Sequence, residues 1–368
     1  MNYFFWQNTN SFHQSSFLEA LYLCEHHVTL IVTEPLSQHR KNMGWVEPTL
    51  EDVTVIKAYD DESIPYELIE PNSHDVHVFF GISAFRRVHK AFLWAIQQKA
   101  RIGIFTEPLD FRGFKGILRN IRGFWHKSKY AKHIAFVLTT GKQGVSQFEN
   151  WGYDKNKVYE WAYTVQDSTE VLSASQPIEI YNIVYVGSLL HLKGYDILIN
   201  AVKQLQANVQ LHLYCYSAGE KNQVESIKRE LNNVDNIHLY PFLSNNEIRK
   251  KIPDYDLLVL PSRYDGWGVV INESLAEGTP VIVSSRCGSS TLINNEKLGD
   301  VISTLHAESL KKMIENRLKR GKINRETRNY TKEWARNHIS GHAMSTYLER
   351  IIDYIDGHTA QKPSAPWK

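Results

Sequence analysis

The chain has 368 residues, more than a single hydrophobic core usually organises, so its length predicts two domains of about 150–200 residues each. An apolar fraction of 42% and a charged fraction of 22% are those of a globular protein and exclude a disordered chain. The formal net charge of +2 argues against a general nucleic-acid-binding protein, and we expect no nucleic-acid partner.

Cysteine usage and hydropathy predict a cytoplasmic protein. Cys24, Cys215 and Cys287 are few, far apart and without the spacing of metal ligands, as is usual in a reducing compartment. Residues 1–14 lack the basic start and apolar run of a signal peptide. No stretch approaches the roughly 20 apolar residues that span a bilayer. We therefore expect a cytoplasmic chain, with a peripheral position on the inner face of the cell membrane considered below.

The first half of the chain alternates between short apolar runs and helical patterns. Apolar residues at three- and four-residue spacing predict helices over 14–26 and 84–100. The apolar runs, each read as a strand, lie at 3–6, 28–33, 53–59, 76–82, 101–107 and 134–140. Strands that alternate with helices in this way predict a parallel sheet that is covered by helices on both faces.

The second half restarts the same pattern after a polar, serine-rich linker at 169–181. The expected strands are 181–188, 209–216, 237–242, 256–262 and 280–285, and the expected helices are 195–206, 220–232 and 245–251. We predict an α/β fold of two Rossmann-like, doubly wound domains that face a cleft, at 1–172 and 173–335. A C-terminal helix over 336–356 is expected to cross back to the first domain, and a polar tail, 357–368, is expected to be disordered.

The stretch "DGWGVVINESLAEG" directly follows an expected strand, which places Asp265 at the carboxyl end of the second sheet. Gly266 and Gly268 would leave peptide N–H groups open to a ligand, and the start of the next helix would suit a phosphate. Glu273, inside that helix, could accept the two vicinal hydroxyls of a ribose. The alternative is a glycine turn before an ordinary amphipathic helix with a solvated Glu273, and spacing alone does not decide between the two.

Three stretches carry a resemblance to a known family. "PSRYDGWGVVINESLAEGTPVIVSS", residues 261–285, resembles the signature of the retaining family 4 glycosyltransferases of the GT-B fold, the glycosyl transferases group 1. "YVGSLLHLKGYDILINAV", residues 185–202, resembles the strand, loop and helix that carry a Gly-Arg pair and then Lys-Gly in that family. "WQNTNSFHQSSFLEAL", residues 6–21, resembles the loop that opens the acceptor domain of bacterial members. The resemblance covers the second domain throughout and the first mainly in layout.

The resemblance implies a role for each matching residue. Glu273 would hold the ribose of a sugar nucleotide, Asp265 would contact the hydroxyls of the donor sugar, and Lys193 would neutralise the leaving diphosphate, so these three are the catalytic candidates. Lys193 also has a structural reading, as the solvated start of a helix. The full set of donor-binding candidates is Gly187, Ser188, Lys193, Arg263, Asp265, Gly266, Trp267, Gly268, Val269 and Glu273.

Two residues depart from the pattern of the family. Asp265 stands where the family usually has Glu, and Ser188 stands where it usually has Arg, which removes a side chain suited to phosphate. Arg263 and Arg286 are the candidates to supply the missing charge. A non-catalytic, nucleotide-sugar-binding partner subunit with the same fold is therefore the main alternative. A phosphorylase or a sugar-nucleotide epimerase of the same shape is a further one.

The resemblance also implies the reaction. A sugar would pass from a nucleotide-diphosphate sugar, more commonly a UDP-sugar than a GDP-sugar, to a saccharide or lipid-linked oligosaccharide acceptor in the synthesis of surface polysaccharide or lipopolysaccharide. No cofactor and no metal are expected, and we reject the Asp254 and Asp256 pair as a metal site because Asp256 directly precedes a strand. Glu107, at the end of an expected strand, and His13, in the first expected strand–helix loop, would both lie at the cleft edge of the first domain, where each could orient the acceptor or be structural.

One basic segment has a separate interpretation. Residues 111–133 contain no acidic residue, and an apolar stripe repeats at helical spacing with cations beside it. The stripe consists of Phe111, Phe114, Leu118, Ile121 and Trp125. We favour contact with an anionic membrane surface, through Arg112, Lys115, Arg119, Arg122 and Trp125. The alternative is a stripe that packs on the first domain while the cations are merely solvated, and glycines within the segment weaken the helix prediction.

Overall fold

The computed structural model describes residues 1–42, 45–60, 64–71, 73–167, 180–205, 208–216 and 221–368, which divide into two compact units. Unit 1 consists of Met1–Leu36, Glu47–Gln166 and Asn337–Lys368, and unit 2 of Ser37–Val46 and Asp167–Arg336. The structure describes only the last two residues of the predicted linker at 169–181. The predicted boundary at 172/173 lies outside the described residues. The sequence did not predict that Ser37–Val46, with the short helix α2 (Gln38–Asn42), would belong to unit 2.

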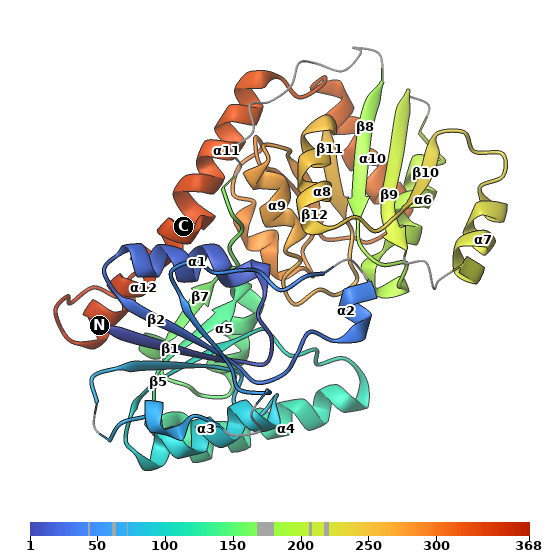
Figure 1. Ribbon diagram of the computed structural model, residues 1–368. Helices are drawn as coiled ribbons and strands as arrows, with labels where there is room; N and C mark the ends of the chain where they lie inside the picture. The colour runs from blue at the N-terminus through green and yellow to red at the C-terminus, as the bar shows by residue number, and fades with distance from the viewer. Residues whose placement is uncertain (43–44, 61–63, 72, 168–179, 206–207, 217–220) are drawn as a thin grey trace. The chain divides into compact units, whose positions relative to one another are not determined.

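Unit 1 is built on a parallel sheet of seven strands in the order β3-β2-β1-β4-β5-β6-β7 (Figure 1). The strands are β1 (Asn2–Gln7), β2 (His27–Val32), β3 (Thr54–Lys57), β4 (Val76–Phe80), β5 (Arg101–Thr106), β6 (Ile134–Thr140) and β7 (Val158–Trp161). The order reverses between β1 and β4, which is where open α/β sheets leave room for a ligand beyond their carboxyl ends. The sequence predicted every strand except β7, a four-residue strand whose pattern is interrupted by Glu160.

Helices cover both faces of this sheet, as the alternation of strands and helices predicted. They are α1 (Phe12–Leu23), α3 (Arg86–Gln97), α4 (Gly113–Tyr130), α5 (Gly141–Asn150) and α12 (Gly341–Ile355). On one face, Phe5 of β1 meets Phe17 of α1 with ring centroids 5.6 Å apart. On the other face, Phe79 of β4 meets Phe92 of α3 at 5.7 Å. Successive strand residues point to opposite faces, so each strand contributes to both layers of the core.

The C-terminal helix is broken in two, which differs from the single helix that we predicted over 336–356. Helix α11 (Arg325–Ile339) ends at Ser340, and the Ser340 hydroxyl accepts a hydrogen bond from the backbone N–H of Ala343 at 3.1 Å to begin α12. A Cβ on Gly341 would lie 2.0 Å from the Ser16 carbonyl oxygen, so the chain breaks where it comes close to α1. Helix α12 belongs to unit 1, in agreement with the predicted return to the first domain.

The tail 357–368 is packed, and the expectation of a disordered tail is wrong. Trp367 is only 2% exposed. Lys362 Nζ donates to the Val158 carbonyl at 2.8 Å, and Lys368 Nζ lies 2.7 Å from Glu160 Oε2. The two lysines anchor the tail on β7, and the Trp367 ring is buried.

Unit 2 has a parallel sheet of six strands in the order β10-β9-β8-β11-β12-β13. The strands are β8 (Tyr181–Val186), β9 (Val209–Tyr216), β10 (Ile237–Pro241), β11 (Leu257–Leu260), β12 (Val281–Ser284) and β13 (Gly299–Ile302). The helices are α6 (Tyr195–Val202), α7 (Lys221–Glu230), α8 (Asn245–Lys251), α9 (Val270–Ala276) and α10 (Ala307–Lys319). Both sheets therefore follow the doubly wound order of a Rossmann-like domain, as predicted. In unit 2 the sequence did not predict α2, β13, α10 or the first part of α11.

Among the described helices of both units, none is at once long enough and apolar enough to cross a lipid bilayer.

Candidate functional site

The order of strands in unit 2 reverses between β8 and β11, so the loops that follow these two strands lie side by side. Lys193 ends a short 3₁₀ turn in the first loop, and Gly194 follows it with a φ of +72°. A Cβ at this position would lie 2.1 Å from the carbonyl oxygen of Pro261 in the second loop. Gly194 therefore allows the two loops to touch, which explains why a glycine follows Lys193.

Lys193 and Asp265, which lie 72 positions apart in the sequence, form an ion pair at this junction. Lys193 Nζ donates to Asp265 Oδ2 at 2.7 Å. The two side chains are 29% and 12% exposed, respectively. The sequence identified both residues but assigned them to different parts of a ligand. The structure brings their charges into direct contact.

The glycine turn after Asp265 is held by the segment that follows β12. The Asp265 N–H donates to the Arg286 carbonyl at 3.2 Å, and the Asp265 carbonyl accepts from the Gly288 N–H at 3.2 Å. Gly268 has a φ of +83°, and a Cβ there would lie 2.5 Å from Cys287 Sγ. Burial raises the pKa of the Cys287 thiol, which keeps the thiol protonated beside the turn. The bare backbone of the turn is therefore required for packing within unit 2.

Trp267 points into the core of unit 2. Its side chain is 2% exposed, and its indole N–H donates to Asn272 Oδ1 at 2.7 Å. A ligand at this turn can reach the backbone of Trp267 but not its ring. The neighbouring candidates Gly266, Gly268 and Val269 are each partly exposed.

Glu273 lies in α9 and is 4% exposed, so the alternative of a solvated glutamate is wrong. Its Oε1 accepts a hydrogen bond from Asn245 Nδ2, at the start of α8, at 2.5 Å. Burial raises the pKa of Glu273, while the charge of Arg249 and the bond from Asn245 offset part of that rise. Arg249 itself pairs with Glu277, the residue that follows the last residue of α9, at 2.5 Å. A carboxylate that is buried away from water needs polar partners, and Asn245 is one of them.

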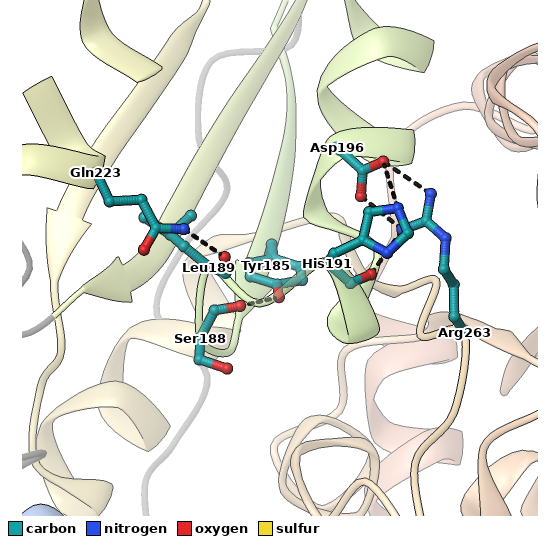
Figure 2. A network of polar contacts seen from close by, with 7 residues as sticks. All are labelled: Tyr185, Ser188, Leu189, His191, Asp196, Gln223 and Arg263. Carbon is teal, nitrogen blue, oxygen red and sulfur yellow. Dashed lines mark hydrogen bonds and ion pairs between the residues drawn. The ribbon is translucent and has the colours of Figure 1, made fainter. Parts of the chain in front are cut away.

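The loop after β8 is held by side chains that donate to its carbonyl groups (Figure 2). The Tyr185 hydroxyl donates to the Ser188 carbonyl at 2.9 Å, and Gln223 Nε2 donates to the Leu189 carbonyl at 2.7 Å. Burial raises the pKa of Tyr185 well above its usual value, so this donor stays protonated. Figure 2 shows the Ser188 hydroxyl pointing away from this network. Gly187, just before it, is partly exposed on the same loop.

Arg263 is engaged within unit 2. Its two terminal nitrogens each donate to one oxygen of Asp196 at 2.7 Å, and Nη1 also donates to the His191 carbonyl at 2.6 Å (Figure 2). Burial acts to raise the pKa of Asp196, but the hydrogen bonds and charge of Arg263 outweigh it and hold that pKa below its usual value. Arg263 thus fixes the loop after β8. The side chain of Arg286 is exposed, which leaves Arg286 as the candidate for an additional cation.

Unit 1 brings the two acceptor-side candidates together through a residue that the sequence did not identify. The Tyr163 hydroxyl donates to Glu107 Oε1 at 2.6 Å, and the Tyr163 ring lies 5.8 Å from that of His13. The His13 carbonyl also accepts from the Thr164 N–H at 2.9 Å. These residues follow the carboxyl ends of β1, β5 and β7. Tyr163 was missed because it follows β7, which the pattern of apolar residues did not reveal.

Within the described part of the chain, no three or more His, Cys, Asp and Glu side chains are grouped so as to hold a metal ion. Asp256 is 3% exposed and accepts from the Asn182 N–H at 2.8 Å, which gives it a structural role next to β8. The absence of a metal or other cofactor from the reaction stays a prediction.

Comparison with known proteins relates the second half of the chain to one family. Residues 175–337 match the glycosyl transferases group 1 family, so this part of the chain is a domain of that family. The lipopolysaccharide glucosyltransferase WaaG of Escherichia coli K12 is 24% identical over 178 residues, which are 48% of this chain and 46% of WaaG. The chain spans less than half the length of the curated relatives named first in the comparison.

Solved structures match nearly the whole chain in fold. A glycosyltransferase from Rickettsia africae ESF-5 aligns with a TM-score of 0.71 at 15% identity and covers 97% of this chain and 100% of its own. The Alr3699/HepE protein of Anabaena, in complex with UDP, aligns with a TM-score of 0.71 at 12% identity, over 96% of this chain and 100% of its own. At these identities the likeness shows the fold alone: two Rossmann-like domains that match those of GT-B glycosyltransferases.

Proposed function

We propose that this protein is a retaining, metal-independent glycosyltransferase of family 4 that takes a sugar from a nucleotide-diphosphate sugar. The observation that carries the proposal is the ion pair of Lys193 with Asp265. It lies at the switch point of the one sheet that belongs to the group 1 domain, which is where open α/β sheets bind their ligands.

The ion pair offers the two charges that such a transfer needs. Lys193 is partly exposed and would move its ammonium group onto the diphosphate as negative charge develops there. Asp265 would then be free to accept hydrogen bonds from hydroxyls of the donor sugar. The backbone N–H groups of the glycine turn would contact the sugar and the phosphate.

In this proposal no side chain of the protein acts as a nucleophile, and the acceptor attacks the donor sugar directly. The bond from the anomeric carbon to the phosphate oxygen breaks, and the acceptor hydroxyl oxygen forms its bond on the same face of the sugar. The hydroxyl proton passes to the departing phosphate oxygen, so the products are a glycoside and a nucleoside diphosphate. The protein contributes positioning and electrostatic stabilisation.

Glu273 would accept the ribose hydroxyls of the nucleotide and would exchange its contact with Asn245 for them. A UDP-sugar is the donor that we favour, with a GDP-sugar as the alternative. The Anabaena protein of the same fold was solved with UDP, which supports uridine without deciding it.

The acceptor would be a saccharide or a lipid-linked oligosaccharide. The partial similarity to a lipopolysaccharide glucosyltransferase supports a role in the synthesis of lipopolysaccharide or another surface polysaccharide. On the acceptor side we assign Tyr163, together with His13 and Glu107, because the three side chains form one contact group at the carboxyl ends of the strands.

The second candidate function is a non-catalytic partner subunit that binds a nucleotide sugar. Two residues of the site support it. Ser188 offers no cation where the family usually has Arg, and Arg263 is held by Asp196. Such a protein would bind the donor without consuming it.

To test the proposal, we would measure how fast the purified protein consumes each donor in a panel of UDP- and GDP-sugars. We expect Lys193→Ala to lower kcat by about 100-fold or more, because it removes a positioned charge from the leaving group. We expect Glu273→Gln to raise the donor KM by about 10-fold, because one charged acceptor for the ribose is lost. Lys203→Ala is the matched control, since Lys203 pairs with Glu230 on the surface of the same unit.

Several outcomes would decide against parts of the proposal. Full activity in both site variants would show that the site is elsewhere. Nucleotide binding by calorimetry without turnover, with any acceptor tried, would select the non-catalytic alternative. Inversion at the anomeric carbon of the product, read by NMR, would reject the retaining mechanism. Loss of activity in the presence of EDTA would reject metal independence.

A further inference from the structure

Helix α4 turns its small residues toward the protein and its large apolar residues toward solvent. Gly116, Gly123 and Tyr130 follow one another at seven-residue spacing, so they share one side of the helix, and all three are buried. A Cβ on Gly123 would lie 2.0 Å from the ring of Trp151, and the Trp151 indole N–H donates to Asn120 Oδ1 at 2.8 Å. The glycines that weakened the helix prediction are thus what seats the helix on unit 1.

The opposite side of α4 is a continuous apolar surface. We define the α4 apolar face as the exposed residues Phe114 (74%), Ile117 (58%), Leu118 (52%), Ile121 (60%), Phe124 (49%) and Trp125 (52%). Their spacing of three and four residues places them on one stripe. The alternative that the stripe packs on the first domain is therefore wrong for these residues. Phe111, which precedes α4, is 36% exposed, and its ring meets that of Trp151.

A row of cations runs along one side of this face. Lys115, Arg122 and Lys129 are exposed and seven residues apart, so they form a line parallel to the helix axis. Lys129 Nζ lies 4.7 Å from the centroid of the Trp125 ring, which ties the cation row to the apolar face.

Two of the expected cations have other partners. Arg112 pairs with Asp110 at 2.7 Å, and Arg119 Nη1 donates to the Asp110 carbonyl at 2.8 Å. The bonds from Arg112 lower the pKa of Asp110 to about 2, which keeps this carboxylate charged and paired. The charge of the exposed surface therefore comes from Lys115, Arg122 and Lys129.

We propose that the α4 apolar face docks on the surface of an anionic lipid bilayer. The helix has 18 residues and is about 27 Å long, enough to lie in the plane of the interface with its apolar side chains among the lipid chains. The cation row would then lie at the level of the anionic headgroups. Lipid fits this surface better than a second copy of the chain, because two α4 faces packed together would share six cations and no acidic residue from 111–133.

The proposal concerns a surface of unit 1 that includes no residue of the candidate donor or acceptor site, so it does not depend on the proposed transferase activity. An enzyme that acts on lipid-linked acceptors would gain from it, because docking concentrates the protein at the surface where such acceptors lie.

Co-sedimentation with vesicles tests the proposal on the full chain. We expect the protein to bind vesicles of phosphatidylcholine with phosphatidylglycerol at low salt, and to bind phosphatidylcholine alone much more weakly. Phe114→Ser with Ile121→Ser should weaken binding by about 10-fold or more, because two apolar side chains no longer enter the lipid. Arg122→Glu with Lys129→Glu should abolish the preference for anionic lipid.

Leu23→Ser is the control for the apolar variant, because Leu23 is 75% exposed on α1, and Lys312→Glu is the control for the charge variant. All variants should keep the melting temperature of the wild type, since the substituted side chains are exposed. Absence of binding to anionic vesicles, or equal binding by wild type and α4 variants, would overturn the proposal. So would a dimer in light scattering that the Phe114 and Ile121 substitutions dissociate.

Discussion

The ion pair of Lys193 with Asp265 is weak enough for a charged ligand to displace Asp265 from the lysine. A partly exposed ion pair contributes about 1 kcal/mol or less to stability, because water and salt screen it and two long side chains lose freedom. A diphosphate with two or more negative charges competes well with a single carboxylate for the same ammonium group. In the proposed function, the pair would keep the lysine in place at little energetic expense until the donor binds.

Glu273 illustrates how burial and function compete at one residue. Its raised pKa follows from the loss of water, and Asn245 and Arg249 only partly compensate. A buried carboxylate that is not fully paired is destabilising by itself. In the proposed function, the ribose hydroxyls of the donor would supply the polar contacts that this carboxylate lacks.

At the residue scale we predict that Tyr163→Phe weakens binding of the acceptor and leaves binding of the donor unchanged. The change removes the hydroxyl that holds Glu107 at 2.6 Å, so the carboxylate loses its orientation. In steady-state transfer assays the acceptor KM should rise by about 10-fold, the effect of one lost hydrogen bond to a charged group, while the donor KM stays the same.

Tyr159→Phe is the matched control, because the Tyr159 hydroxyl donates to the Asn156 carbonyl, away from this contact group. It should leave both KM values unchanged. An unaltered acceptor KM in Tyr163→Phe would show that the His13, Tyr163 and Glu107 group is structural.

At the scale of the element, the break between α11 and α12 shows a local signal acting together with a distant contact. A serine can begin a helix by accepting a bond from the third residue after it, and Ser340 does so here. Nothing in the local sequence forbids a continuous helix through 340. The close approach of Gly341 to the Ser16 carbonyl is the distant contact, because a side chain at 341 would clash with α1.

We predict that Ser340→Ala lowers the free energy of unfolding by about 1 kcal/mol, the usual effect of removing a helix N-cap. Ser128→Ala, on the exposed side of α4, is the control and should change it little. Urea denaturation followed by circular dichroism measures both. Equal stability of the two variants would mean that the contact of Gly341 with α1, and not the cap, ends α11.

At the scale of the whole molecule, the chain returns to unit 1 after it has completed unit 2. Helix α12 and the tail 357–368 pack within unit 1, where His26 Nε2 meets Glu349 Oε1 at 3.0 Å and Trp161 stacks near Tyr347. The fold of unit 1 thus depends on residues from both ends of the chain. A two-unit protein of this kind is expected to unfold in more than one step.

The buried tail leads to a prediction about unit 1. Trp367→Ala should remove about 3–5 kcal/mol from the stability of unit 1, because it deletes a nearly fully buried ring. Differential scanning calorimetry should show one transition moved to lower temperature. Trp125→Ala, which changes a half-exposed ring of α4, should leave the transitions in place. Unchanged transition temperatures in Trp367→Ala would show that the tail adds nothing to the stability of unit 1.

The sequence alone determined the fold class and most strands and helices of both units, and it predicted the residues of a donor site. Alternation of apolar runs and helical spacing is a local property, and it indicates the layers of a doubly wound sheet without any knowledge of contacts. It failed at β7 and β13, because a strand of four residues that includes an acidic side chain is too short to show a pattern.

Only the tertiary structure decided which residues meet. Lys193 pairs with Asp265, Asn245 reaches Glu273 and Tyr163 joins His13 to Glu107 through contacts between distant parts of the chain. The same holds for α4. Helical spacing says that residues share one side of a helix, but only packing decides which side faces the protein. In α4 the ring of Trp151 leaves no room for a side chain at position 123, and the backbone of Phe111 leaves none at 116, so glycines face the protein and the large apolar residues are on the surface.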